Sequence, residues 1–377
     1  MKSQAAVVTG RDEPWRVVEI DVAPPAAGEV LVEWHAAGLC HSDEHFRSGD
    51  RVAPGADAAL YPMLGGHEAA GIVAEVGAGV TTVAPGDRVC ASFSPICGRC
   101  RYCTSGRGSL CNGNKDFMLR GQLVDGAHRH HLDGEPLYLM AKLGTFAERT
   151  VVAERSVIPI PADVPFEAAA LVSCGVATGW GSAVERAGTR PGDVVVVVGC
   201  GGLGLSAVQG ARSVGAGEII AVDPLPLRRD GAKTCGATRT TASIDEARGI
   251  VADLTDGQGA DRVILTPSVV TPDILHDGLD VTGKDGVLVV TGMGPFGETA
   301  VPLDIGAFAL LNKQIRGCLF GSLDPRTATP RLLDLYRSGL LDIDAMITRY
   351  PLADIGIALA DQLEGRNLRG VLVMNGA

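Results

Sequence analysis

The sequence has few aromatic residues, fewer basic than acidic residues, and no long apolar run. Aromatic side chains are 4% of the 377 residues, so a core must be built chiefly from Val, Leu, Ile and Ala. The formal net charge is −11, and no run of five basic residues occurs. A surface that binds nucleic acid is therefore not expected.

Nothing in the sequence predicts export or membrane insertion. Residues 1–15 carry no long apolar stretch and no export cleavage pattern. The longest uncharged run, 194–211, has the length of a membrane span, but its five glycines favour a strand, a turn and a helix. We expect a cytoplasmic protein without membrane contact. Ten cysteines in that reducing compartment indicate metal binding rather than disulfides.

Length and hydrophobic pattern predict an α/β protein of two domains. The first 170 residues show short alternating β-segments such as GEVLVEWHAAG and EAAGIVAEVGAGV. From about Pro165, helices alternate with apolar strands (DVVVVVG, EIIAVD, DRVILT and GVLVVTG), which is typical of a doubly wound parallel sheet of the Rossmann type. We assign residues 173–317 to this domain and residues 1–172 and 318–377 to a mainly β domain, with a helix in RLLDLYRSG.

Four cysteines, Cys97, Cys100, Cys103 and Cys111, fall in the segment CGRCRYCTSGRGSLC. Thiolates at this spacing can surround one Zn²⁺ tetrahedrally and leave no open position, which is the pattern of a structural site. An iron–sulfur cluster also takes four cysteines, but in runs of other spacing. A further alternative is that the four cysteines are buried in a hydrophobic core. Their Gly, Arg, Ser and Thr neighbours are not residues that form such a core. We predict a structural zinc lobe over residues 94–114.

A glycine-rich turn of the form G-x-G-x-x-G follows the valines at 194–198. Its residues are Gly199, Gly201, Gly202, Leu203 and Gly204. Such a turn lets a pyrophosphate approach the N-terminus of the next helix. Asp223 ends the following strand, where a carboxylate can bind the ribose hydroxyls of NAD and repel the 2′-phosphate of NADP. Arg228 and Arg229 follow closely, so NADP remains an alternative cofactor. A second alternative is a strand, turn and helix that bind no nucleotide, with Asp223 in its position by chance.

Five motifs occur in one order along most of the chain: GLCHSDEH, GGHEAAG, the four-cysteine segment, SCGVATGWGSAV and GCGGLG. Taken singly, their Cys and His residues would be ordinary core or hydrogen-bonded residues. Together the motifs resemble the zinc-containing medium-chain alcohol dehydrogenases. The resemblance implies a GroES-like catalytic domain, two zinc ions per chain, and reversible oxidation of a primary alcohol to an aldehyde by hydride transfer to NAD.

The resemblance also implies which residues form the active site. The ligands of the catalytic zinc are Cys40, His67 and Cys174. Cys₂His ligation with an open fourth position is the known arrangement in alcohol dehydrogenase. Glu68 matches a carboxylate that approaches the metal, and Ser42 and His45 match a relay that carries the alcohol proton toward solvent.

Further contacts follow from the same resemblance. The additional cofactor contacts are His41, Thr178 and Arg369. The residues that match the lining of the alcohol pocket are Phe93, Met140 and Met293. Ordinary core packing is the alternative for these three, and an apolar pocket suits medium-chain or aromatic alcohols. Two features depart from the family: DRVAPGADAALYP is longer than its counterpart, and Pro224 and Pro226 follow Asp223.

Within the family, GLCHSDEH, LGTFAER, SCGVATGW and LFGSLDP resemble an actinobacterial subgroup assayed with N,N-dimethyl-4-nitrosoaniline, NDMA. The resemblance implies tightly bound NAD that an external acceptor reoxidises in place, with mycofactocin as redox partner, in a homo-oligomer (dimer or tetramer). Two alternatives remain. One is a thiol-dependent formaldehyde dehydrogenase, which shares both zinc sites. The other is an inactive zinc- and nucleotide-binding relative, which the presence of all ligand and relay residues disfavours.

Overall fold

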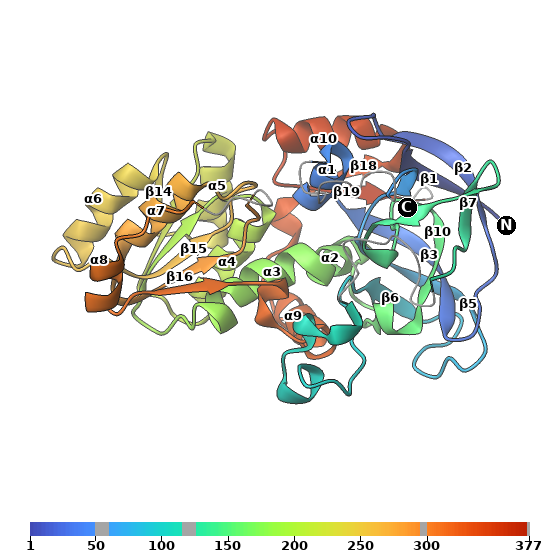
Figure 1. The fold of residues 1–377 in the computed structure, drawn as a ribbon, viewed down its shortest axis with the longest axis horizontal. Coiled ribbons are helices and arrows are strands. Elements are labelled where there is room, and N and C mark those ends of the chain that lie inside the picture. The colour runs from blue at the N-terminus through green and yellow to red at the C-terminus, as the bar shows by residue number, and fades with distance from the viewer. Residues whose placement is uncertain (50–59, 115–125, 295–299, 375–377) are drawn as a thin grey trace. The chain divides into compact units, whose positions relative to one another are not determined.

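The computed structural model describes residues 1–49, 60–114, 126–294 and 300–374. The chain divides into two compact units (Figure 1). Unit 1 comprises Met1–Cys174, Asp324–Arg337 and Ile347–Ala377, and unit 2 comprises Gly175–Leu323 and Ser338–Met346. The chain therefore enters unit 2 at residue 175 and first leaves it at residue 324, whereas the functional domain boundaries given above stay a prediction.

Unit 1 is built on two β-sheets that bury the alternating apolar residues of its strands. The first sheet has the order β8-β7-β2-β1-β4-β9. Its strands are β1 (Lys2–Val8), β2 (Arg16–Val22), β4 (Met63–Leu64), β7 (His130–Leu132), β8 (Glu135–Pro136) and β9 (Tyr138–Leu139).

The second sheet of unit 1 has the order β11-β6-β5-β3-β19-β18, with β10 paired to β3. Its strands are β3 (Glu29–Gly38), β5 (Glu68–Val76), β6 (Arg88–Ala91), β10 (Arg149–Ala153), β11 (Val157–Pro159), β18 (Ile347–Pro351) and β19 (Arg369–Val373). The long strand β3 pairs with β5 and β19, which brings residues near positions 40, 68 and 369 to one end of the sheet.

Four α-helices belong to the described part of unit 1: α1 (His41–Ser48), α2 (Phe166–Leu171), α9 (Pro325–Arg337) and α10 (Ile355–Leu363). Helix α9 contains the predicted RLLDLYR segment. Helix α1 follows β3 directly and ends at Gly49, whose positive φ of 68° suits glycine. Helix α2 continues into the π-helical segment Val172–Val176, which carries Cys174. Single π-turns within α-helices are frequent at functional sites.

Unit 2 contains an open sheet in which all paired strands are parallel. Its order is β14-β13-β12-β15-β16-β17. The strands are β12 (Val194–Val198), β13 (Glu218–Val222), β14 (Arg239–Thr241), β15 (Ala260–Leu265), β16 (Thr282–Val290) and β17 (Gln314–Gly317). This is the strand order of a Rossmann fold, so the predicted fold class is confirmed.

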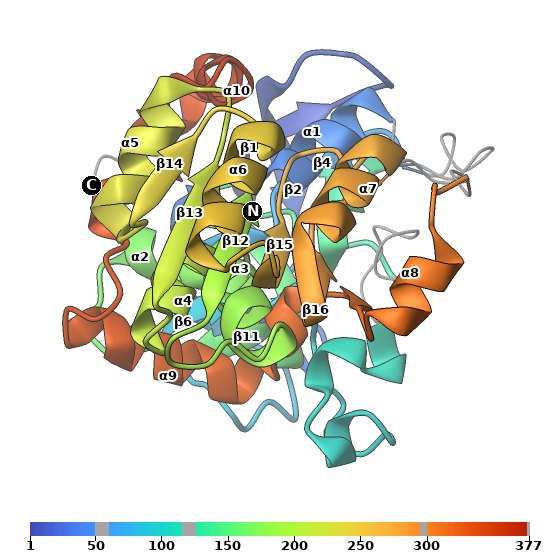
Figure 2. The same ribbon diagram turned by 90° about the vertical axis from the view of Figure 1, so that its left-hand side faces the viewer.

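Helices cover both faces of this sheet, with α4 beside α5 and α6 beside α7 (Figure 2). The α-helices of unit 2 in the described residues are α3 (Ala177–Gly181), α4 (Gly202–Ser213), α5 (Pro226–Cys235), α6 (Ile244–Leu254), α7 (Pro272–Val281) and α8 (Ile305–Leu310). Coverage on both faces explains why β12 is valine throughout, since side chains on either side of the strand are buried. Among the described residues, no helix combines the length and hydropathy that crossing a membrane requires.

Candidate metal centres and cofactor site

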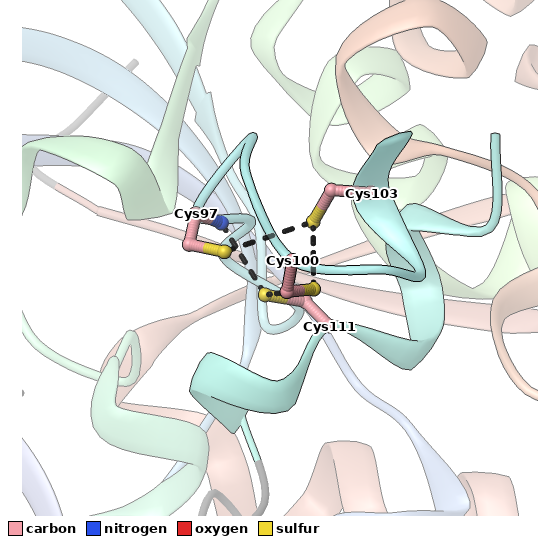
Figure 3. Close-up of side chains that lie close together, drawn as sticks. All are labelled: Cys97, Cys100, Cys103 and Cys111. Carbon is pink, nitrogen blue, oxygen red and sulfur yellow. Dashed lines mark hydrogen bonds between the residues drawn. The ribbon is translucent and has the colours of Figure 1, made fainter. Parts of the chain in front are cut away.

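The four closely spaced cysteines converge on one point in a loop of unit 1 (Figure 3). Their sulfurs lie 3.5 Å (Cys100 to Cys103), 4.0 Å (Cys97 to Cys103) and 4.0 Å (Cys100 to Cys111) apart. Tetrahedral Zn–S bonds of about 2.3 Å place sulfurs roughly 3.8 Å apart, so the geometry fits a closed zinc site.

Backbone amides support the negative charge of this cluster. The N–H groups of Cys97 and Gly113 each donate to Cys111 Sγ over 3.3 Å. Hydrogen bonds from the backbone of Cys103 and Asn112 lower the pKa of Cys100 to about 6. Thiolates are the form that binds metal, so these donors favour the ligand state. All ten cysteines of the chain lie in the described residues as free thiols.

A second cluster joins Cys40, His67, Glu68 and Cys174, whose candidate ligand atoms all lie within 4.8 Å of one another. Cys40 caps α1, Glu68 begins β5 with His67 directly before it, and Cys174 lies on the π-helical segment. All four are buried. Thiols, an imidazole and a carboxylate are the donor types that bind zinc, and burying such polar groups together is unfavourable unless they are paired. The cluster thus fits a cation.

Asp43 orients this cluster and was not predicted from the sequence. Its Oδ2 accepts a hydrogen bond from the Cys40 amide over 2.9 Å, and its Oδ1 lies 3.3 Å from His67 Nδ1. With Nδ1 engaged, Nε2 of His67 is the nitrogen left for a metal. Desolvation lowers the pKa of His67, but the negative charges of Asp43 and Cys40 raise it by more. The net shift of this pKa is therefore upward. An acidic residue three positions after a helix cap is the signal that could have revealed Asp43.

Glu68 is held by a buried arginine. Nη2 of Arg369, on β19, donates to Glu68 Oε2. Burial raises the pKa of Glu68 to about 7, and the positive charge of Arg369 opposes that rise. Glu68 Oε1 is buried and has no hydrogen-bond partner within the described residues. A buried carboxylate oxygen without a hydrogen-bond partner, beside two thiols, again suits a site that binds a cation.

Two of the predicted relay and pocket residues of unit 1, Ser42 and Phe93, contact this cluster. Ser42 Oγ lies 3.6 Å from Cys40 Sγ. His45 is only 4% exposed, and its ring centroid lies 5.1 Å from that of His41. His45 is therefore a buried side chain rather than a solvated one. Phe93 meets His67 edge-on, with 5.8 Å between ring centroids.

The structure also locates the two predicted pocket methionines and part of the features in which the sequence differs from the family. Met140 is buried in unit 1, and Met293 is half-buried in unit 2, where it bridges to Val269. Most of the long segment DRVAPGADAALYP lies outside the described residues. Pro226 is the first residue of α5, a position where proline is favourable.

The glycine turn of unit 2 has room for a ligand. Gly199 has a φ of 89°, and a Cβ there would lie 2.6 Å from the Pro267 nitrogen. A Cβ at Gly204 would collide with the Gly199 carbonyl. At Gly201, by contrast, a Cβ would meet nothing within 4 Å among the described atoms. The open space beside Gly201, at the start of the twelve-residue helix α4, fits a pyrophosphate.

Asp223 is fixed in place before any ligand arrives. It is 1% exposed, and its carboxylate accepts hydrogen bonds from the amides of Cys200 (2.8 Å) and Leu225 (2.9 Å). The Arg228 guanidinium lies 3.8 Å from the carboxylate. Thr178 is buried in α3 of the same unit and accepts a hydrogen bond on its carbonyl from Ser182 Oγ.

Comparisons with known proteins agree with this architecture. Residues 26–162 match the alcohol dehydrogenase GroES-like domain, and residues 202–338 match the zinc-binding dehydrogenase domain. The chain is 43% identical to an NDMA-dependent alcohol dehydrogenase of Amycolatopsis methanolica, over 99% of each chain.

Two solved structures share the fold over the whole chain. One is an alcohol dehydrogenase zinc-binding domain protein from Burkholderia ambifaria, with a TM-score of 0.92 and 31% identity over 100% of this chain and 99% of that one. The other is benzyl alcohol dehydrogenase from Acinetobacter calcoaceticus, with a TM-score of 0.90 and 28% identity over 100% of both chains. The expected cofactors, zinc and NAD, are those of such dehydrogenases. The chain is therefore an oxidoreductase that belongs to the zinc-containing alcohol dehydrogenase family.

Proposed function

We propose that the protein oxidises a primary alcohol to an aldehyde at a zinc held by Cys40, His67 and Cys174, with NAD as hydride acceptor. The observation that carries the proposal is the convergence of these side chains in one buried cluster, although they lie far apart in the sequence. These three side chains would hold the zinc, which would supply Lewis acidity to the alcohol. A second zinc, held by the four-cysteine lobe, has no open position and stabilises the fold.

The bound cofactors supply Lewis acidity and a hydride acceptor. The chain's own residues hold and move the remaining charge. Asp43 keeps His67 in one tautomer, and Arg369 balances the buried charge of Glu68, the carboxylate that would lie beside the metal. The Ser42 hydroxyl, beside Cys40, is placed to take the alcohol proton.

His45 is the proposed next acceptor in this relay. Its ring is buried beside that of the half-buried His41, so the proton route continues along the first turns of α1 rather than straight into water. An imidazole ring can both accept and donate a proton, which suits a group that passes protons on.

We propose that the glycine turn, from Gly199 to Gly204 and including Leu203, holds the cofactor in unit 2 together with Asp223 and Arg228. The preorganised Asp223 carboxylate favours NAD over NADP. His41, Thr178 and Arg369 are the remaining proposed contacts to NAD.

The similarity to an enzyme named as NDMA-dependent supports the use of an external electron acceptor. The further proposal is that NAD stays tightly bound and is reoxidised in place, with mycofactocin as the natural partner. The apolar side chains Phe93, Met140 and Met293 are proposed to line the alcohol pocket, in line with medium-chain or aromatic substrates. A cytoplasmic location suits the free thiols.

A homo-oligomer is proposed through the edge of the unit 2 sheet. Strand β17 is an edge strand of that sheet. Exposed apolar side chains gather on β17 and α8: Ile305 is 74% exposed, Leu310 88% and Ile315 38%. Unpaired sheet edges and exposed apolar residues favour pairing with a second copy. Light scattering distinguishes a dimer or tetramer from a monomer.

The central experiment is denaturation of the purified enzyme followed by measurement of released zinc and NAD(H). Two zinc ions and one NAD(H) per chain are expected, with benzyl alcohol oxidised in the presence of NDMA. One zinc per chain would contradict the catalytic site. Formaldehyde oxidation that depends strictly on an added thiol would instead establish the formaldehyde dehydrogenase.

A further inference from the structure

The segment that carries His67 and Glu68 is bracketed by a second segment of unit 1, residues 138–146. At one end, β9 pairs with β4, and the Tyr138 amide donates to the Pro62 carbonyl over 3.0 Å. At the other end, the amides of residues 145 and 146 donate to the carbonyls of Gly66 (3.1 Å) and Gly65 (2.9 Å). Hydrogen bonds on both sides thus fix the backbone that leads into His67.

The chain between these two ends folds into an unusual turn. Ala141 has a φ of 52°, Lys142 a φ of 62° and Gly144 a φ of 61°. Left-handed backbone is disfavoured for residues with a Cβ, so two consecutive cases persist only where the surroundings impose them. The amides of Leu143 and Gly144 both donate to the Met140 carbonyl, which closes the turn. The closed turn sets the position of the residue that follows, Thr145.

Thr145 makes side-chain and main-chain contacts to the metal-binding segment. It is fully buried, its amide bonds Gly66, and its hydroxyl donates to the Glu68 carbonyl over 3.3 Å. Gly66 has a φ of 89°, and a Cβ there would lie 2.6 Å from Thr145 Oγ1. Thr145 therefore holds the main chain on both sides of His67, and these two hydrogen bonds go to backbone carbonyls rather than to the candidate ligand atoms of the cluster.

We propose that Thr145 is a positioning residue for the catalytic metal. Its hydroxyl and amide hold the peptide groups on either side of His67, so that the imidazole and the Glu68 carboxylate keep their places relative to Cys40. Metal sites tolerate displacements of only about 0.5 Å in their ligands. Groups that orient ligands without binding the metal commonly change metal affinity 10- to 100-fold when they are removed. This inference rests on the proposed role of His67 as a ligand.

The test compares Thr145→Val, which removes the hydroxyl at nearly constant volume, with Thr145→Ser, which keeps it. A chromogenic chelator measures the rate at which each zinc ion leaves the enzyme. We expect about tenfold faster release of one zinc from Thr145→Val and an unchanged rate for Thr145→Ser. In Co²⁺-substituted enzyme, the visible absorption of the catalytic site should shift in the Val variant alone, because that absorption reports ligand geometry. If Val prevents folding, Thr145→Ala against Thr145→Ser gives the same comparison.

Thr150→Val is the matched control. Thr150 is equally buried in the same unit, and its hydroxyl accepts a 2.7 Å hydrogen bond from Trp34 Nε1, away from the cluster. It should lower stability and leave both zinc release rates unchanged. If the wild type holds two zinc ions and Thr145→Val releases both at the wild-type rates, this inference is overturned and the proposed function stands. A wild-type enzyme with one zinc would contradict the proposed function instead.

Discussion

His130 is a buried histidine whose ring must stay neutral in the folded protein. It is 1% exposed, on β7. Its Nε2 accepts a 3.0 Å hydrogen bond from the Val151 amide, so the ring proton is on Nδ1. A second proton on the ring would make Nε2 a hydrogen-bond donor, and it would then face the Val151 N–H, which is also a donor. Burial, reinforced by the positive charges of His131, Arg129 and His128, lowers the pKa of His130 to about 3.

The direction of the effect on stability follows from that shift. Between the unfolded pKa near 6.5 and the folded pKa near 3, the unfolded chain binds a proton that the folded chain does not. The stability that depends on neutral His130 is therefore fully present above about pH 7, and it is lost as the pH falls through this window. At about pH 5.5 the loss from His130 is RT ln(1 + 10), or about 1.4 kcal/mol. For a unit of this size, that loss corresponds to about 3–6 °C in the unfolding midpoint.

The assay measures unfolding midpoints at about pH 8 and pH 5.5 for the wild type and for His130→Gln. Glutamine can accept the Val151 hydrogen bond through its amide oxygen but does not titrate. Other groups that lose stability in acid, including the zinc ligands, are common to both proteins and cancel in the difference. The wild type should lose about 1.4 kcal/mol more than the variant over this interval. Equal losses in the two proteins would refute the reasoning.

Three further substitutions test the metal centres. Cys174→Ser should abolish alcohol oxidation and lower zinc content by one ion while the fold is retained by circular dichroism; full activity would rule out the assigned site. Cys103→Ser should lose the other zinc and lower the unfolding midpoint, since a closed Cys₄ site contributes directly to folding; an unchanged melting curve would argue against a structural zinc. Asp43→Ala should weaken zinc binding at the catalytic site about 10- to 100-fold in chelator competition, because His67 loses its orienting carboxylate. Wild-type affinity there would show that Asp43 only stabilises the start of α1 through its bond to the Cys40 amide.

Local pattern in the sequence was sufficient for the features whose parts are neighbours along the chain. The four cysteines fall within one short segment, so any compact loop brings their sulfurs together, as it does. The valines, glycines and acidic residue of the cofactor motif follow one another through a strand, a turn, a helix and a strand. Continuous apolar strands alternating with helices can bury both faces only in a parallel sheet.

Contacts between distant segments were decided by the tertiary structure. Nothing in the spacing of Cys40, His67 and Cys174 connects them, and the sequence linked them only through family resemblance. Their convergence depends on β3 pairing with β5 and on the helix that follows residue 165. The bond between Arg369 and Glu68 spans 301 residues, and the grip of Thr145 on the Glu68 carbonyl spans 77. Such contacts depend on strand register and loop closure, which no short stretch of sequence encodes, and they place the groups that would hold a reactive metal.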